Sequence, residues 1–173
     1  MKSDFKDLYR AYSLGFPYPK IEVCEKNLNY ANLIQPNYAS TVSELTSVAQ
    51  YTYQQFITSD DIKSTLKGIA MVEMHHLEIL GELIIALGGN PNFCINKKSK
   101  PLYWNSKFIK EYNSVGELLM KNIDSEKKAI DQYRKTANLI EDENIIAILN
   151  RIILDEEYHV KLLTSLYEKE MNK

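Results

Sequence analysis

The sequence predicts an all-α protein, a four-helix bundle in which two antiparallel helix hairpins are joined by a long crossover. Two stretches place apolar residues at alternating steps of four and three, which is the spacing of a helix face buried inside a bundle. The connections between the expected helices are short, long and short in turn. Helices joined by a short turn run antiparallel, so this order of connections gives two hairpins.

The clearest buried face belongs to the second expected helix, over residues 62–87. Its residues at alternating steps of four and three are Ile62, Leu66, Ile69, Glu73, His76, Leu80, Leu83 and Leu87. Every member is apolar except Glu73 and His76, so a carboxylate and an imidazole occupy core positions. Residues 58–60 supply the preceding turn and N-cap, and the Gly-Gly-Asn-Pro sequence at 88–91 is a strong termination signal.

The same rhythm recurs near the C-terminus, in the fourth expected helix. Its buried face is Ile145, Leu149, Ile152, Glu156, His159, Leu163 and Leu166. Two helices therefore carry the motif Glu-x-x-His at core positions. Residues three apart on a helix project from one face, so each motif can direct a carboxylate and an imidazole toward a common point.

The first and third helices complete a concealed repeat. Glu44 and Tyr51 are seven residues apart on the first helix. Glu126 and Tyr133 are seven residues apart on the third. The interval between these two glutamates is 82 residues, and the interval between the two Glu-x-x-His glutamates is 83. We therefore expect the two hairpins to be related by a pseudo-twofold axis.

The chain is expected to contain one bundle and one extension. Residues 1–36 are rich in Tyr, Phe and Pro and are expected to form an irregular N-terminal extension packed on the bundle. The bundle is expected over residues 37–173, with its first helix starting after Pro36. About two dozen residues without a clear period precede Ser114, which is expected to cap the third helix. Fully extended, they reach roughly 80 Å, so the crossover can run the length of a bundle about 40 Å long.

Composition and charge exclude several classes of protein. A chain of 173 residues that is 45% hydrophobic fits one domain with a sizeable core. Its net charge of -2, with acidic and basic residues interspersed, gives no reason to expect a nucleic acid or a membrane as a partner. The N-terminus lacks the apolar core of a signal peptide, and the longest purely apolar run covers only residues 83–87. A cytoplasmic protein is expected.

The two cysteines add no redox module. Cys24 and Cys94 are isolated and form no Cys-x-x-Cys pair. Neither a structural zinc ribbon nor an iron–sulfur module can be built from them. Any electron donor is therefore expected to be another molecule.

Four carboxylates and two imidazoles would lie inside the bundle: Glu44, Glu73, His76, Glu126, Glu156 and His159. Each buried ionised carboxylate costs several kcal/mol unless it is paired. Two divalent cations balance four carboxylates if both histidines are neutral, as metal-bound imidazoles are. Glu from each of two helices with Glu-x-x-His from each of the other two is the ligand pattern of dinuclear carboxylate sites. We predict that these six residues bind two metal ions; the alternative is a polar core that fixes helix register.

From about residue 38 to residue 168 the chain resembles the ferritin-like superfamily. Glu73-Met74-His75-His76 and Asp155-Glu156-Glu157-Tyr158-His159 are similar to the second and fourth helices of bacterioferritins. The pairs of Glu followed by Tyr resemble rubrerythrins. His76-Leu77-Glu78-Ile79-Leu80-Gly81 and the lead-in Pro19-Lys20-Ile21-Glu22-Val23 are similar to manganese catalases and related spore-coat proteins.

The resemblance implies two iron or manganese ions per chain, and hard oxygen donors with two imidazoles suit both metals. It implies bridging roles for Glu73 and Glu156 and terminal roles for Glu44 and Glu126. It also implies one histidine on each metal.

Four residues near the predicted ligands have expected roles of their own. Tyr51 and Tyr133 are candidate catalytic residues that could hydrogen-bond carboxylates or bound oxygen species, with core packing as the alternative. Asp155 is a candidate to hold the free ring nitrogen of His76. Haem is not expected, although Met74 occupies the position that supplies a haem ligand in bacterioferritins, because a methionine on a helix flank usually packs.

The leading functional prediction is an oxidoreductase whose dinuclear iron or manganese centre acts on hydrogen peroxide or dioxygen. Peroxidase, catalase and ferroxidase chemistry would all follow from the same ligands, and a homo-oligomer is expected. The first alternative is an iron-storage or iron-handling protein, in which the site loads a cavity. The second alternative is a metal-free helical interaction module.

Overall fold

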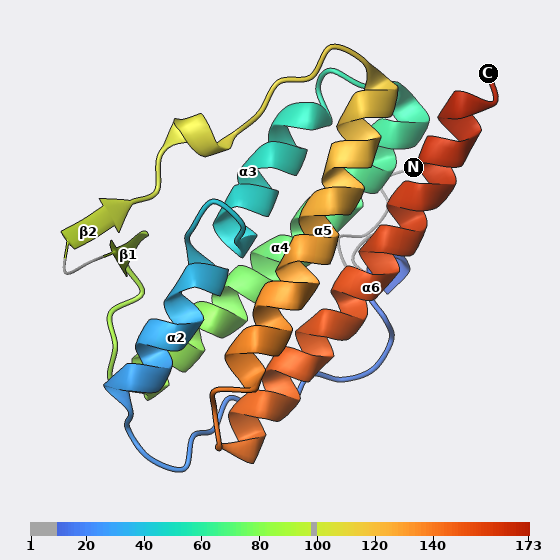
Figure 1. Ribbon diagram of the computed structural model, residues 1–173. Helices are drawn as coiled ribbons and strands as arrows, with labels where there is room; N and C mark the ends of the chain where they lie inside the picture. The colour runs from blue at the N-terminus through green and yellow to red at the C-terminus, as the bar shows by residue number, and fades with distance from the viewer. Residues whose placement is uncertain (1–9, 98–99) are drawn as a thin grey trace.

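Helices dominate the part of the chain that the computed structural model describes, residues 10–97 and 100–173 (Figure 1). The helices are α2 (Leu28–Tyr38), α3 (Glu44–Gln54), α4 (Asp60–Ala86), α5 (Val115–Ala137) and α6 (Glu143–Met171). Helices α3 and α4 form one antiparallel hairpin and α5 and α6 form the other, with the crossover running along the bundle (Figure 1). The predicted all-α bundle of two hairpins is confirmed.

The ends of α4 and the starts of α5 and α6 lie where the sequence signals place them. Ser114 caps α5 and Asp142 caps α6, each through a side-chain oxygen that accepts hydrogen bonds from backbone N–H groups of the first turn. Helix α4 begins directly after Ser59 and ends before Gly88. Gly88 has a φ of 83°, a left-handed conformation that glycine adopts without strain and that ends the helix.

The start of the bundle differs from the prediction. The extension expected to be irregular over residues 1–36 contains helix α2, and Pro36 lies inside that helix instead of before it. Asn27 caps α2, and the buried side chains of Ala31 and Ile34 outweigh the one hydrogen bond that the proline removes near the helix end. The first long helix is therefore two helices, α2 and α3, with a break between them. Residues 1–9 lie outside the described residues.

The crossover also contains structure that the sequence did not predict. Its elements are the antiparallel strands β1 (Cys94–Lys97) and β2 (Lys100–Tyr103) and the 3-10 helix η1 (Ser106–Phe108). Strand β2 is exposed along its whole length, so it lacks the alternation of buried and exposed residues that would reveal a strand. Trp104 Nε1 donates to Thr46 Oγ1 at 2.9 Å, and Gln50 exchanges hydrogen bonds of 2.7 and 2.8 Å with the backbone of Lys110. These contacts fasten the crossover to α3.

Two apolar clusters fill the bundle, one on each side of a polar layer. One cluster includes Leu80, Leu83, Ile84, Leu87, Ile145 and Leu149. The other includes Ile62, Leu66, Ile69, Leu118, Leu119 and Leu163. On α4, Glu73 and His76 lie between Ile69 of one cluster and Leu80 of the other. The polar layer is therefore closed along the bundle axis by packed apolar side chains.

Candidate metal centre

Six acidic and histidine side chains, the carboxylate–histidine cluster, meet at the middle of the bundle. Two overlapping groups can each hold a metal ion: Glu44, Glu73, His76 and Glu156 in one, and Glu73, Glu126, Glu156 and His159 in the other. Within each group the candidate ligand atoms lie within 4.8 Å of one another. All six residues are buried, with at most 3% of their surface exposed. The structure thus brings together every residue predicted as a ligand, and Glu73 and Glu156 are common to both groups.

Both imidazoles turn the nitrogen Nδ1 toward the carboxylates. His76 Nδ1 lies 3.0 Å from Glu156 Oε1 and 3.6 Å from Glu73 Oε2. His159 Nδ1 lies 3.1 Å from Glu73 Oε1 and 3.3 Å from Glu156 Oε2. The other ring nitrogen, Nε2, points out of the cluster in both residues.

The cluster has the chemistry of a metal site. Among the described residues, the buried side-chain atoms without a hydrogen-bond partner include Glu44 Oε2, Glu73 Oε1, His76 Nδ1 and Glu156 Oε1. Polar atoms left in this state are costly in a protein interior, and all four face the same small volume. Carboxylate oxygens and imidazole nitrogens are ligands of iron and manganese. The residues present therefore fit two metal ions.

The four carboxylates differ in their affinity for protons. Burial, followed by the negative charge of Glu73, raises the pKa of Glu44 and of Glu126 well above the ordinary value. Burial acts in the same direction on Glu73 and Glu156. There, however, close polar contacts outweigh burial and lower the pKa. Glu44 and the two histidines have this effect on Glu73, and the two histidines have it on Glu156. The two shared carboxylates are thus the ionised pair in the metal-free protein.

The histidines hold protons when no metal is bound. Burial acts to lower the pKa of His76 and His159, but the groups around each ring more than offset burial and raise both pKa values well above the ordinary value. At His76 these groups are Tyr18 and then the nearby carboxylates, and at His159 they are Glu156 and Glu73. A metal ion binds only the neutral imidazole. Metal binding must therefore displace protons from the cluster.

The two predicted tyrosines hydrogen-bond the cluster across the bundle. Tyr51 on α3 donates to Glu126 on α5, and Tyr133 on α5 donates to Glu44 on α3. Both phenols are almost fully buried. Burial, followed by the charge of the accepting glutamate, raises the pKa of each tyrosine well above the ordinary value. The two tyrosines therefore stay protonated and act as hydrogen-bond donors.

The outer side of His76 is held as the sequence predicts, by Asp155. Asp155 Oδ2 lies 3.3 Å from His76 Nε2. Burial acts to raise the pKa of Asp155, but its contacts with His76, then Tyr18 and Arg151, lower that pKa to about 2. The carboxylate is therefore ionised and accepts hydrogen bonds.

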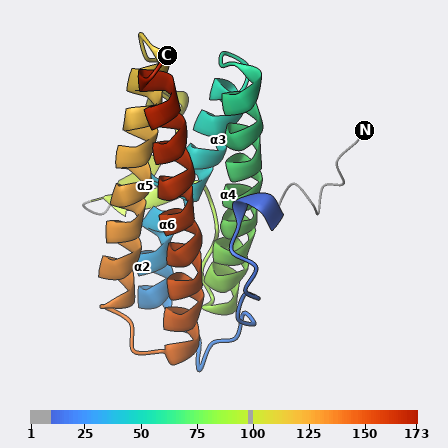
Figure 2. The same cartoon turned by 90° about the vertical axis from the view of Figure 1, so that its right-hand side faces the viewer.

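Sequence reasoning missed the part that the N-terminal segment plays. The hydroxyl of Tyr18 lies 3.0 Å from His76 Nε2, and the backbone carbonyl of Tyr12 lies 3.1 Å from His159 Nε2. Figure 2 shows this segment, in blue, along the side of the bundle formed by α4 and α6. One residue could have indicated this contact from the sequence. Arg151 is a charged residue in an apolar stretch of α6, and it lies four residues before Asp155 on the same helix face.

Two side chains next to the motif on α4 lie outside the cluster. His75 is part-exposed, with Nδ1 3.6 Å from Glu78 and its ring edge-on to the ring of Tyr18 at 4.9 Å. Met74 is exposed to 45% on the flank of the helix. Neither side chain points toward the candidate ligands.

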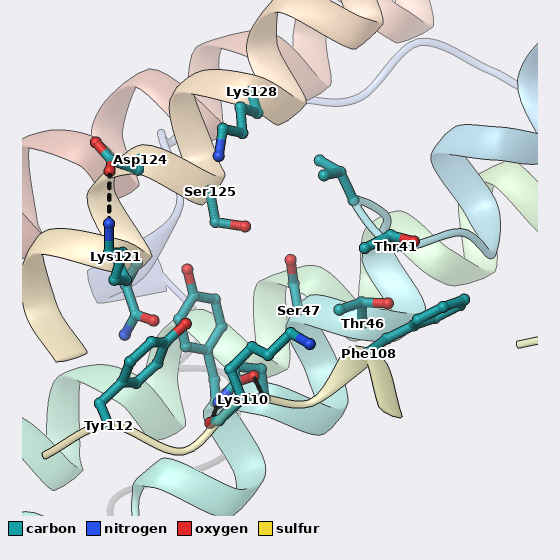
Figure 3. A pocket seen from close by; sticks show the side chains of 14 residues that line it. Thr41, Thr46, Ser47, Phe108, Lys110, Tyr112, Lys121, Asp124, Ser125 and Lys128 are labelled. Atoms are coloured by element: carbon teal, nitrogen blue, oxygen red, sulfur yellow. Dashed lines mark hydrogen bonds and ion pairs between the residues drawn. The ribbon is translucent and has the colours of Figure 1, made fainter. Parts of the chain in front are cut away.

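A cavity of about 180 Å³ lies between α3, α5 and the end of the crossover (Figure 3). Its lining includes buried Tyr51, whose hydroxyl reaches Glu126, and the exposed residues Lys110, Lys121 and Lys128. Ser47 from α3 faces the α5 side of the cavity (Figure 3). The cavity thus reaches from three exposed lysines to Tyr51, which hydrogen-bonds Glu126, but none of the six residues of the carboxylate–histidine cluster lines it.

Comparison with known proteins agrees with this architecture. The sequence profile of the ferritin-like domain matches residues 41–171, most of the chain. The chain belongs to the ferritin-like family. A protein named probable manganese catalase, from Clostridium acetobutylicum, is 24% identical in an alignment of 175 positions that covers 89% of this chain and 75% of that protein.

Solved structures of this family superpose on the bundle. A manganese catalase from Anabaena has a TM-score of 0.81 and 25% identity, with 90% of this ferritin-like chain and 78% of the other covered. A bacterioferritin from Desulfovibrio desulfuricans has a TM-score of 0.69 and 21% identity, with 83% and 81% covered. The second match supports the fold alone. None of the described helices combines the length and the apolar character needed to cross a membrane.

Proposed function

We propose that this protein is an oxidoreductase with a dinuclear manganese centre that disproportionates hydrogen peroxide. The observation that carries the proposal is the convergence of two carboxylate–histidine groups that share Glu73 and Glu156. The similarity to manganese catalases supports the metal and the reaction, because it extends over 89% to 90% of the chain. A match of that extent cannot fit within residues 41–171 alone, so it includes part of the N-terminal segment.

Each ligand has a role in this proposal. Glu73 and Glu156 would be shared by the two ions, since both groups contain them. Glu44 and Glu126 would each hold one ion, and each histidine would bind through Nδ1, the nitrogen that faces the carboxylates. Two redox-active ions held by these residues would supply a two-electron exchange with peroxide.

The side chains around the ligands orient them and hold protons. Tyr51 and Tyr133 fix the terminal carboxylates by donating hydrogen bonds to them. Because burial keeps both phenols protonated, they serve as donors and not as bases. The apolar clusters on either side keep bulk water away from the ligands along the bundle axis.

The cavity between α3 and α5 is the proposed route for peroxide. It connects exposed lysines with Tyr51 at the edge of the cluster. Its volume of about 180 Å³ admits a molecule of two oxygen atoms easily. The proposed enzyme therefore takes in peroxide through the α3/α5 side of the bundle.

Metal analysis joined to three parallel assays tests this proposal. Protein expressed in medium supplemented with manganese and iron should contain two ions per chain, chiefly manganese. Added hydrogen peroxide should release dioxygen without any electron donor, in the ratio of one dioxygen to two peroxides. The variant Glu73→Ala with Glu156→Ala should lose both the metal and the activity, whereas Glu78→Ala, an exposed glutamate of the same helix, should keep both.

The same measurements separate the competing functions. Peroxide consumption that needs a donor would indicate a peroxidase. Rapid oxidation of ferrous iron with assembly into a large shell would indicate iron storage. A thermal midpoint that does not change when metal is removed would indicate a metal-free module, since a ligand at about 100 times its Kd adds ~2.7 kcal/mol of stability.

A further inference from the structure

Residues 12–18, which we call the N-terminal strap, run along the side of the bundle formed by α4 and α6 (Figure 2) and contact both histidines of the cluster. The cavity lies on a different side, between α3 and α5. The strap supplies a hydrogen-bond partner to the outer nitrogen of both histidines, through Tyr12 and Tyr18. These contacts come from a segment that lies outside the four helices of the bundle.

The partner of His159 determines which nitrogen of that ring carries the proton. His159 Nε2 lies 3.1 Å from the carbonyl oxygen of Tyr12. A carbonyl oxygen only accepts hydrogen bonds, so Nε2 must donate. In the neutral ring the lone pair is then on Nδ1, the atom that faces Glu73 and Glu156.

The partners of His76 have the same effect through side chains. Tyr18 donates its hydroxyl hydrogen to Asp155, and its oxygen lies 3.0 Å from His76 Nε2. With that hydrogen used, the phenol oxygen accepts from His76 Nε2. The lone pair of the neutral ring is again on Nδ1, 3.0 Å from Glu156 Oε1.

Two features fix the strap in place. Arg151, exposed to only 5%, donates to strap carbonyl oxygens at 2.7–3.1 Å and lies 4.2 Å from the centre of the Tyr18 ring. Gly68 on α4 makes room for the ring of Tyr12, because a Cβ atom at this position would lie 2.0 Å from that ring. The strap is therefore held by specific contacts with both α4 and α6.

We propose that the strap orients the two histidines for metal binding. Tyr18 positions His76, and the Tyr12 carbonyl positions His159, so that each ring can coordinate a metal ion through Nδ1. The inference rests on the dinuclear centre proposed above. Groups that orient a ligating histidine in this way affect metal binding strongly. Loss of one strap contact should therefore weaken the binding of one metal ion and leave the affinity for the other unchanged.

Manganese titration of the metal-free, full-length protein tests this assignment. Two variants serve as parents, because each keeps one of the two ligand groups intact. Glu126→Ala retains the group that contains His76, and Glu44→Ala retains the group that contains His159. Adding Tyr18→Phe should weaken Mn²⁺ binding about 10–100-fold in the Glu126→Ala parent. It should leave binding unchanged in the Glu44→Ala parent. The matched control is Tyr158→Phe, which removes a hydroxyl bonded to the Ala11 carbonyl but not to an imidazole.

A glycine substitution gives an independent second test. Gly68→Ala should displace Tyr12 and weaken Mn²⁺ binding about 10–100-fold in the Glu44→Ala parent. The control on the same helix is Gly81→Ala, whose Cβ would meet the Tyr38 ring at an ordinary 3.4 Å. Because Ala favours a helix more than Gly does, both changes are compatible with folding, which circular dichroism would verify.

The outcomes separate this inference from the proposed function. Unchanged affinity for both Tyr18→Phe and Gly68→Ala would overturn the strap's role while leaving the metal centre intact. Equal losses in both parents would overturn it as well, because they would indicate general destabilisation. Failure of the unmodified protein to bind Mn²⁺ would refute the metal centre itself, and the strap's role would fall with it.

Discussion

Tyr133 on α5 donates a hydrogen bond to Glu44 on α3, on the opposite hairpin. The reciprocal bond joins Tyr51 on α3 to Glu126 on α5. Each tyrosine is seven residues, or about 10 Å along the axis, from the glutamate of its own helix. The crossover returns the chain to the far end of the bundle, so α5 runs antiparallel to α3 and the two seven-residue intervals overlap. The hairpins are thereby cross-linked at the level of the cluster.

Removal of one cross-link should weaken the site without unfolding it. Tyr133→Phe leaves the buried oxygen of Glu44 without a donor, so we expect the free energy of unfolding of the metal-loaded protein to fall by about 1–3 kcal/mol. Urea unfolding measures this change. Tyr51→Phe should give a similar loss because of the pseudo-twofold relation. The control is Tyr53→Phe, which changes a half-buried tyrosine of α3 that belongs to neither ligand group. If only one of the two variants lost stability, the result would contradict the pseudo-twofold relation between the hairpins.

Metal content should fall in steps that follow the two ligand groups. Glu44 belongs to one group only, whereas Glu73 belongs to both. Glu44→Ala should therefore retain about one ion per chain and Glu73→Ala should retain fewer, as elemental analysis of dialysed protein would show. Equal metal content in the two variants would contradict the assignment of Glu73 as a bridge.

The metal-free protein should lose stability as the pH rises. Folding raises the pKa of His76 and His159 above 6.5 and that of Glu44 and Glu126 above 4.5. A group of this kind contributes stability that is complete below its unfolded pKa and is lost as the pH rises through its folded pKa. All four residues act in the same direction. Urea unfolding of dialysed protein from pH 6 to about 9 would measure the decline.

Metal loading should reverse that dependence. The bound ions hold the ligands in their deprotonated forms, so the apparent affinity for Mn²⁺ should rise with pH over the same range. Calorimetry in buffers with different ionisation enthalpies would detect protons released on binding. An affinity that falls with rising pH, or binding without proton release, would contradict the protonation states described for the cluster.

A larger side chain in the cavity should slow the reaction with peroxide. Ser47→Phe fills space between α3 and α5, so we expect kcat/KM for peroxide to fall at least about tenfold, equal to about 1.4 kcal/mol in the barrier. Metal content should not change, because Ser47 lies outside both ligand groups. Ser64→Phe, on an exposed part of α4, is the matched control. An unchanged kcat/KM would show that peroxide enters elsewhere.

Much of this architecture could be predicted from local sequence. The apolar steps on α4 and α6 place Glu73 and Glu156 in the core, because helical periodicity fixes the face on which a residue lies. Caps such as Ser114 and Asp142 fix where helices begin, since they satisfy backbone groups a few residues away. Where local signals conflict, prediction fails: Pro36 suggested a boundary, but packing of α2 on the core decided otherwise.

The sequence by itself determined α4, α5 and α6, the face that each buries and the duplicated set of six candidate ligands, because these depend on spacing along single helices. Only the tertiary structure decided that each tyrosine serves the opposite hairpin, and that Tyr12 and Tyr18 hold the outer nitrogens of the histidines. Tyr18 and Asp155 are 137 residues apart in the chain. No periodicity spans such a distance, so contacts of this kind arise only when packed helices bring the segments together.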